Sequence, residues 1–303
     1  MTLIAVLLVI ITERLWHPFS SNHIFTPLVH WRDALLRWNP VWFDGATGVL
    51  LTVLPPALIT GMTQYVLVAA DGWFSLLVLL FSVLVLVACV GDQRFGSHVK
   101  QYMKAVSAGD LTAASIYFDG ISSRGFNGES LRELNRAFIG LMLLRMNERV
   151  LALLFWFVIL GPLGAVLYRS VAQLHGSGSD ANAAQVQRYQ DAVLRFKGIL
   201  DWCPARLTAL TYAVTGSFLD AFHMWREDPE RPDDDWVCAN DRMLIDVGIG
   251  ALQLGDYYLG PADAPLDTSL ACEHALAVRD LTRRTLLAAL TILAALTLTG
   301  WLV

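Results

Sequence analysis

The sequence predicts an all-α integral membrane protein, on the basis of its composition and the distribution of its charges. Apolar residues make up 55% of the 303 residues and charged residues only 16%, whereas soluble globular proteins carry roughly 25% charged residues. The mean hydropathy is +0.49, and the charges gather in two blocks, 92–149 and 170–284. This composition excludes a disordered chain, a coiled coil and an ordinary cytosolic enzyme. Because no block is strongly basic, nucleic acid is not expected as a partner.

Four apolar segments predict transmembrane helices. A helix needs roughly 20 apolar residues to cross the hydrocarbon layer, and such runs lie at about 48–70, 73–90, 150–168 and 285–303. A shorter apolar run, Thr2–Thr12, predicts a helix that is half inserted or packed in the bundle. We therefore expect a single membrane domain over residues 1–303, with about four spans and amphipathic helices in the polar regions 92–149 and 170–284.

The basic residues that flank the spans predict the topology in part. Arg37 precedes the first two spans and Arg94 follows them, which puts both flanks of this hairpin in the cytoplasm. Arg283 and Arg284 precede the last span and also belong inside. Two alternatives satisfy this pattern: Leu207–Phe222 crosses or re-enters the membrane, or the 150–168 segment enters without crossing.

Helix signals support the amphipathic elements of the polar regions. Ser130 and Glu133 have the spacing of a capping box, which predicts a helix start at this point. Apolar residues recur from Leu134 to Leu144 at intervals of three and four, as one face of a helix requires. The segment 185–200 predicts a second amphipathic helix.

Charged residues at the ends of apolar segments are the candidate site residues, because charges near membrane depth are costly. Glu13 and His17 follow the N-terminal apolar run and suit acid/base or ligand roles. The alternative is an interfacial anchor in which Trp16 belongs to the aromatic belt.

A second group directly precedes the 150–168 segment. Arg145 and Arg149 are spaced for one helical face, with Asn147 and Glu148 between them. Two adjacent guanidinium groups suit a phosphate or a carboxylate, and Glu148 could hold Mg²⁺. The alternative is flanking positive charge at the cytoplasmic face.

Two further groups lie in the second polar region. Asp201 stands near Pro204, which suits a first helical turn, and Arg206 then enters an apolar stretch. These two residues are either a buried functional pair or a helix cap with a salt bridge. Asn240 and Tyr257 lie near glycines, in a pattern that suits either a ligand-contacting loop or a helix that ends at a glycine cap.

Common catalytic motifs are missing from the sequence. It contains no G-x-x-x-x-G-K-[ST], H-E-x-x-H or G-x-S-x-G pattern. A nucleotide would therefore need a site of another kind.

The charged groups, taken in order, resemble the AmpE family of inner-membrane proteins. The segments that carry this resemblance are Thr12–Pro18, Leu154–Arg169 and Asp201–Leu207, and the most specific parts are the start of the chain through Leu15 and Asp201–Leu207. This resemblance implies a multi-pass protein of the bacterial inner membrane, linked to peptidoglycan recycling and β-lactamase regulation. It also implies an anionic ligand and a protein partner in the induction pathway, beside membrane lipid.

A more distant similarity connects the chain to the CobD/CbiB cobinamide-phosphate synthases. These enzymes join an aminopropanol-type amine to a corrin carboxylate in an ATP-dependent step. The alternative function implied by this similarity is an ATP-dependent amide-forming ligase, with ATP and a Mg²⁺ ion at Glu148 and Asp201. The sequence departs from the synthases at Lys197 and Gly198, where they tend to carry acidic residues, and at Leu153, where they tend to carry proline.

From the residues and the resemblance together we expect two sets of site residues. The catalytic set is Glu13, His17, Glu148 and Asp201. The ligand-binding set is Arg145, Asn147, Arg149, Arg206, Asn240 and Tyr257.

Overall fold

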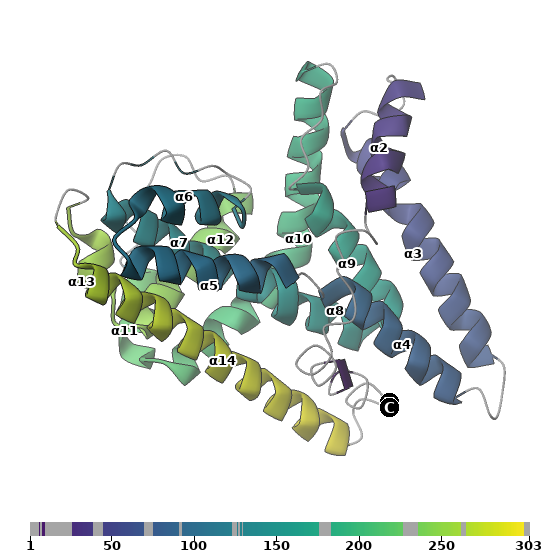
Figure 1. Ribbon diagram of the computed structural model, residues 1–303. Coiled ribbons are helices and arrows are strands. Elements are labelled where there is room, and N and C mark those ends of the chain that lie inside the picture. Colours follow the sequence, from purple (N-terminus) through teal and green to yellow (C-terminus); the bar gives the residue numbers. More distant parts are fainter. Residues whose placement is uncertain are drawn as a thin grey trace. The chain divides into compact units, whose positions relative to one another are not determined.

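The computed structural model describes residues 6, 8–9, 26–38, 45–69, 75–90, 93–122, 126, 128, 130–175, 183–226, 236–261 and 265–299. Every regular element in these ranges is a helix, which confirms the all-α class (Figure 1). Contacts divide the chain into two compact units where the sequence predicted one domain. Unit 1 comprises residues 1–91, 148–202 and 292–303, and unit 2 comprises 92–147 and 203–291.

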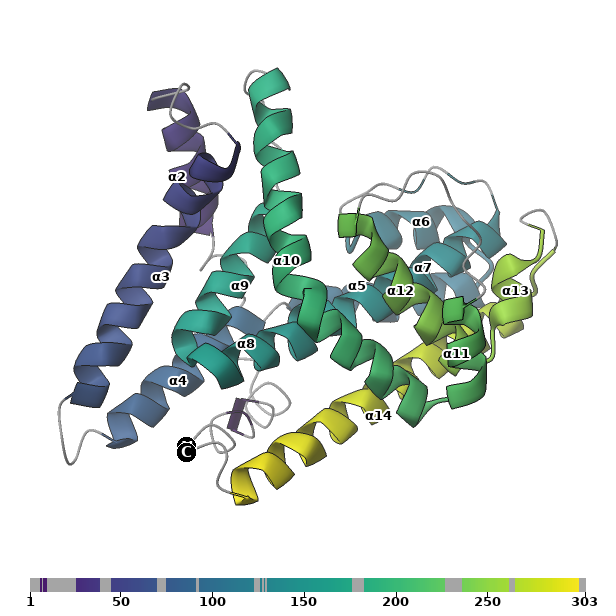
Figure 2. The same cartoon turned by 180° about the vertical axis from the view of Figure 1, so that it is seen from behind.

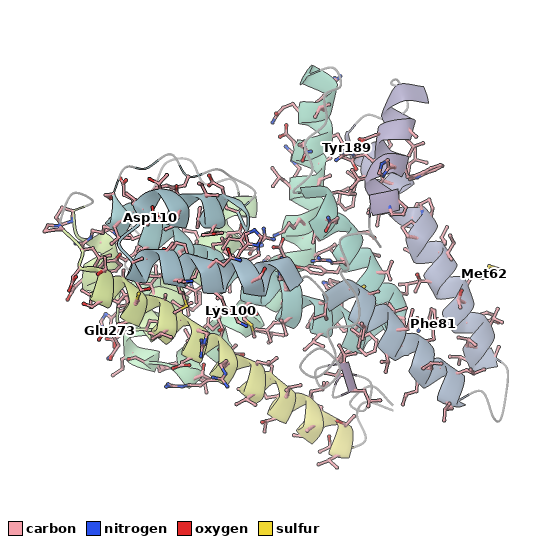
Figure 3. The ribbon with its side chains drawn as sticks, viewed as in Figure 1. Met62, Phe81, Lys100, Asp110, Tyr189 and Glu273 are labelled. Atoms are coloured by element: carbon pink, nitrogen blue, oxygen red, sulfur yellow. The ribbon has the colours of Figure 1, made fainter. Side chains whose placement is uncertain are left out.

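Unit 1 contains the first two predicted spans. They form α3 (Gly45–Ala69), which is long and apolar enough to cross a membrane, and the shorter apolar helix α4 (Ser75–Val90). These two helices pack against each other. Apolar side chains of α3 such as Met62 point outward (Figure 3), as expected of a helix whose surroundings are lipid. A second helix of sufficient length and hydropathy, α14 (Thr268–Leu298), contains most of the predicted last span.

The proline pair in α3 leaves backbone carbonyls without their helical donors, and a tryptophan supplies one replacement. Proline has no N–H, so Pro55 cannot donate to the carbonyl of Leu51. The indole Nε1 of Trp31, on α2 (Thr26–Trp38), donates to this oxygen at 3.4 Å. Such replacement matters most in lipid, where no water can satisfy the carbonyl.

The segment predicted as a third span, 150–168, is not one continuous helix. It is divided into α8 (Ala152–Leu160) and α9 (Pro162–His175), which pack against each other on either side of Gly161. Gly161 has φ 68° and ψ −153°, a conformation that is open almost only to glycine. The chain folds back so far that a Cβ on Gly164 would lie 2.2 Å from the carbonyl oxygen of Trp156. The segment is therefore a helical hairpin and not one continuous span.

Gln64 of α3 satisfies the backbone at this reversal. Its amide nitrogen donates to the carbonyl of Leu160 at 3.5 Å, and its amide oxygen accepts from the N–H of Leu163 at 3.3 Å. Helix α9 also packs against α3 and α4. A broken helix is tolerated at membrane depth when neighbours satisfy the freed groups in this way.

Unit 2 is built from helices of both polar regions. They are α5 (Gln93–Ser107), α6 (Leu111–Asp119), α7 (Leu131–Met146), α11 (Phe218–Arg226), α12 (Trp236–Ala251) and α13 (Gly255–Leu259), with parts of α10 and α14. The Ser130 side chain accepts from the N–H of Glu133, as the capping-box spacing predicted. In the core, Tyr102 stacks on Phe138 with ring centroids 4.0 Å apart.

Residues 207–222 bend within unit 2. Helix α10 (Ala183–Thr215) continues through 207–215, and the chain then turns at Gly216 into α11 (Figure 2). A Cβ on Gly216 would lie 2.4 Å from the carbonyl oxygen of Ala251. Glycine is therefore required where α11 approaches the end of α12.

Candidate functional site

A short π-helix carries three of the predicted site residues. This element, η2 (Asn147–Leu151), joins α7 to α8 and contains Asn147, Glu148 and Arg149. A π-helical turn inserts an extra residue relative to α-helix geometry and occurs frequently at functional sites. Arg145 lies in the last turn of α7 and Arg149 lies in η2, so a joint role of the two guanidinium groups in ligand binding stays a prediction.

Four polar side chains of unit 1 lie close together, and one of them, Glu148, belongs to this π-helix. The ammonium Nζ of Lys197 lies 2.8 Å from Oδ2 of Asp201 and 3.6 Å from Oε1 of Glu148. The hydroxyl of Tyr168, on α9, donates to Oδ1 of Asp201 at 2.7 Å. The structure therefore brings Glu148 and Asp201 together, as expected, but through a lysine. We call Glu148, Tyr168, Lys197 and Asp201 the lysine cluster.

The lysine cluster is almost closed to solvent. Asp201 is 2% exposed and Lys197 is 9% exposed, and Tyr168 is also buried. Charges buried to this degree persist only when they are paired and hydrogen-bonded. Both oxygens of Asp201 have partners, one in Lys197 and one in Tyr168. The cluster is thus a compact network in which one cation serves two carboxylates.

The expected Mg²⁺ ion does not fit this arrangement. Mg²⁺ needs near-octahedral oxygen ligands at about 2.0–2.1 Å, but the ammonium of Lys197 already lies between the two carboxylates. Among the residues that the structure describes, no group of three or more His, Cys, Asp or Glu side chains could hold a metal. Sequence reasoning noted Lys197 only as a departure; its i,i+4 spacing to Asp201 was the available signal.

A tryptophan fixes the helix that carries Lys197 and Asp201. Pro204 lies inside α10 and cannot donate to the carbonyl of Leu200. The indole Nε1 of Trp156, on α8, donates to that oxygen at 3.1 Å. As with Leu51 and Trp31, the carbonyl left without a donor by a proline accepts a hydrogen bond from an indole. This hydrogen bond connects α8 to the part of α10 that carries the lysine cluster.

Replacing Trp156 by phenylalanine should lower the free energy of unfolding by about 1–2 kcal/mol, because the Leu200 carbonyl loses its donor in a buried setting. Pro204→Ala restores a backbone donor, so the same Trp156→Phe change should cost much less in that background. Denaturation by sodium dodecyl sulfate in mixed micelles measures both differences. Equal costs in the two backgrounds would show that the indole acts only by packing.

Unit 2 holds the remaining predicted ligand residues. Nη1 of Arg206, on α10, donates to Oδ1 of the buried Asn240, on α12, at 3.2 Å. Asn147 accepts from Oγ1 of Thr208 at 2.8 Å. Arg206 and Asn240 are thus brought together, and Arg206 remains exposed. Arg145 instead donates to the backbone carbonyl of Ile121 at 3.2 Å.

Tyr257 lies in a cluster that sequence reasoning missed. Nη2 of Arg132 and Nη2 of Arg136, one turn apart on α7, donate to its backbone carbonyl at 2.9 and 2.7 Å. Arg132 also lies over the Tyr257 ring at 4.7 Å, and the Tyr257 hydroxyl accepts from Asn135 at 3.0 Å. Burial raises the pKa of the Tyr257 phenol. These contacts hold α13 against α7, and a role of Tyr257 in ligand binding stays a prediction.

Two predicted catalytic residues cannot be placed. Glu13 and His17 lie outside the residues that the structure describes. Asp201, which was expected to pair with Arg206, contacts Lys197 and Tyr168. Arg206 instead donates to Asn240, a contact that was not expected. Asp201 lies in unit 1, whereas Arg206 and Asn240 lie in unit 2.

Every regular element in the described residues is a helix, and two of the helices are long and apolar enough to cross a membrane. A sequence profile described as CobD/Cbib protein matches residues 2–260, and the chain belongs to this family. It is 31% identical to "Cobalamin biosynthesis protein CobD" of Chromobacterium violaceum over 71% of this chain and 65% of the relative. The protein of the same name from Stutzerimonas stutzeri is also 31% identical, over 69% of this chain and 64% of the relative.

A third relative carries the other name expected from the sequence. "Protein AmpE" of Shigella flexneri is 31% identical over 74% of this chain and 78% of the relative. The chain therefore spans less than two thirds of the two CobD relatives and more than three quarters of the AmpE relative. No solved structure matches the chain.

Proposed function

We propose that this chain is a regulatory, multi-pass protein of the bacterial inner membrane, of the AmpE type. It senses or modulates peptidoglycan recycling and β-lactamase regulation by binding an anionic, phosphate-bearing ligand. A protein of the induction pathway and membrane lipid are its partners. The observation that carries the proposal is the lysine cluster, in which Nζ of Lys197 lies beside both carboxylates that were expected to hold Mg²⁺.

The distribution of charge supports a binding role. Inside the lysine cluster the carboxylates are committed to Lys197 and Tyr168. Arg206 is exposed and donates from Nη1 to Oδ1 of the buried Asn240. A guanidinium held by a buried amide suits recognition of a phosphate or carboxylate. Binding of this kind needs no chemical step.

Deletion of the gene in the bacterium that encodes it should change both induced β-lactamase activity and the pools of muropeptides. The wild-type gene should restore both, and Arg206→Ala should restore them only in part. Lys100→Met, at an exposed position of α5 (Figure 3), is the matched control and should restore them fully. Unchanged enzyme induction and unchanged muropeptides in the deletion strain would refute the proposal.

The second candidate is a CobD/CbiB-like ligase or a relative that acts on another phosphorylated substrate. The match over residues 2–260 and the CobD relatives favour it. Purified protein supplied with ATP, Mg²⁺ and candidate acceptors should then release phosphate only when an acceptor is present. If nucleotide neither binds nor turns over, the regulatory function stands alone.

A further inference from the structure

Helix α11 exposes a continuous apolar face. Phe218, Leu219, Phe222 and Trp225 are 54%, 73%, 42% and 54% exposed, and their spacing puts them on one side of the helix. Ala221, at the edge of this face, is buried. Three large aromatic side chains on so short a helix are unusual for a surface in water, and a contiguous apolar patch marks an interaction site.

The orientation of this face is fixed by contacts at the start of α11. The N–H of Ser217 donates to the carbonyl of Ala251 at 3.0 Å. Asp220 accepts from Oγ of Ser217 at 2.5 Å and from Nε2 of Gln253 at 2.8 Å, and these bonds lower the pKa of the Asp220 carboxyl. Helix α11 also packs along α12 (Figure 2). The apolar face therefore cannot rotate inward without breaking these bonds.

A hydrogen bond within unit 2 relates α11 to the apolar part of α14. Oγ1 of Thr215, at the end of α10, lies 3.2 Å from Oγ1 of Thr285. Thr285 directly follows the exposed Arg283 and Arg284 and begins the apolar run that was predicted as the last span. Arginines in this position mark the boundary between headgroups and hydrocarbon. Phe218, three residues after Thr215, thus begins α11 close to that boundary.

The polar side chains around the apolar face agree with this location. Arg226 ends α11, is exposed, and has its guanidinium 5.6 Å from the Phe222 ring centroid. Aromatic rings next to a cationic side chain, which can bind lipid headgroups, are typical of helices that lie in the interfacial region of a membrane. The acidic stretch 227–235 follows directly in the sequence and is expected to stay in water.

We propose that α11 is an interfacial helix whose aromatic face inserts into a phospholipid bilayer at the boundary between headgroups and acyl chains. Arg226, Arg283 and Arg284 contact the lipid phosphates. The exposed apolar row continues back along α10 through Leu210 and Val214, which extends the surface toward the same layer. This proposal is independent of the regulatory function and of the ligase alternative.

The test places a nitroxide on α11 in the full-length chain. Phe222→Cys is made in a variant with its four native cysteines replaced by serine, labelled, and reconstituted into nanodiscs of phosphatidylcholine. Ile116→Cys is the matched control, because Ile116 is 63% exposed on α6 of the same unit. We expect position 222 to collide several-fold more with oxygen, and several-fold less with a water-soluble nickel complex, than position 116 does.

Two outcomes overturn the proposal. Equal accessibility at 222 and 116 would place α11 in water, and protection of 222 from both reagents would show that a second copy or another protein covers it.

A second measurement keeps the four native cysteines and so guards against misfolding of the cysteine variants. The fluorescence of Trp225 is obtained as the difference in emission between the wild type and Trp225→Phe. In nanodiscs with brominated acyl chains this difference should be largely quenched. A difference that is not quenched would contradict insertion.

Discussion

Replacing Lys197 by methionine should lower the free energy of unfolding by about 3–5 kcal/mol, because the change removes the cation that is paired with the buried Asp201. Nζ of Lys197 also lies 3.6 Å from Oε1 of Glu148. Mn²⁺ should restore much of the stability lost by the variant, since the ion can then occupy the vacated position between the carboxylates. It should leave the wild type unchanged. Denaturant titrations with and without Mn²⁺ measure both effects.

Two variants make this result specific to the lysine cluster. Lys100→Met removes an exposed lysine and should change stability by no more than about 0.5 kcal/mol. Adding Glu148→Gln and Asp201→Asn to Lys197→Met removes every charge of the cluster and should recover much of the loss. Wild-type stability in Lys197→Met alone, or a metal effect on the wild type, would contradict the role assigned to Lys197.

Gly161→Ala should destabilise the protein by about 3 kcal/mol, near the upper end of the cost of a strained backbone position. The residue has φ 68° and ψ −153°, which alanine adopts poorly. The added Cβ would also lie 2.7 Å from Nε2 of Gln64, the side chain that satisfies the reversal. We expect α8 and α9 to separate before the rest of unit 1 unfolds, which proteolysis at the reversal would report.

A glycine in a helix of unit 2 provides the control. Gly96, on α5, has ordinary helical geometry, and a Cβ there would meet nothing within 4 Å. Gly96→Ala should therefore stabilise the protein by about 0.5–1 kcal/mol, because alanine is the better helix former. If both substitutions have the same effect, the conformation of Gly161 is not a special requirement of the fold.

Features that depend on neighbouring residues were predictable from the sequence. The run 48–70 corresponds to α3 and the run 73–90 to α4 within a few residues, because hydropathy over 20 residues is a local property. The Ser130 cap was also predictable, since its partner Glu133 is three residues away.

Features that depend on residues far apart in the sequence were not predictable from it. The Gly161–Pro162 pair indicated a weak point in the 150–168 run, but the reversal needs the amide of Gln64, nearly 100 residues earlier. Arg132 and Tyr257 are 125 residues apart. Lys197 is spaced i,i+4 from Asp201 within α10, a pairing that the sequence permits, but its contact with Glu148 joins residues 49 positions apart. A buried cation facing two carboxylates is visible only after α10 and η2 are placed in unit 1.

The reversal at Gly161 also bears on how the chain is inserted during synthesis. If the α8–α9 hairpin enters the membrane and returns to its starting side, the polar stretch after α9 is not transferred across the membrane. We then expect Arg283 and Arg284 to lie on the cytoplasmic side, as the positive-inside rule predicts. We also expect Cys203 and Cys272, both free thiols, to lie in a reducing compartment. A membrane-impermeant maleimide should leave these two cysteines unlabelled in intact cells and reach them once the membrane is opened.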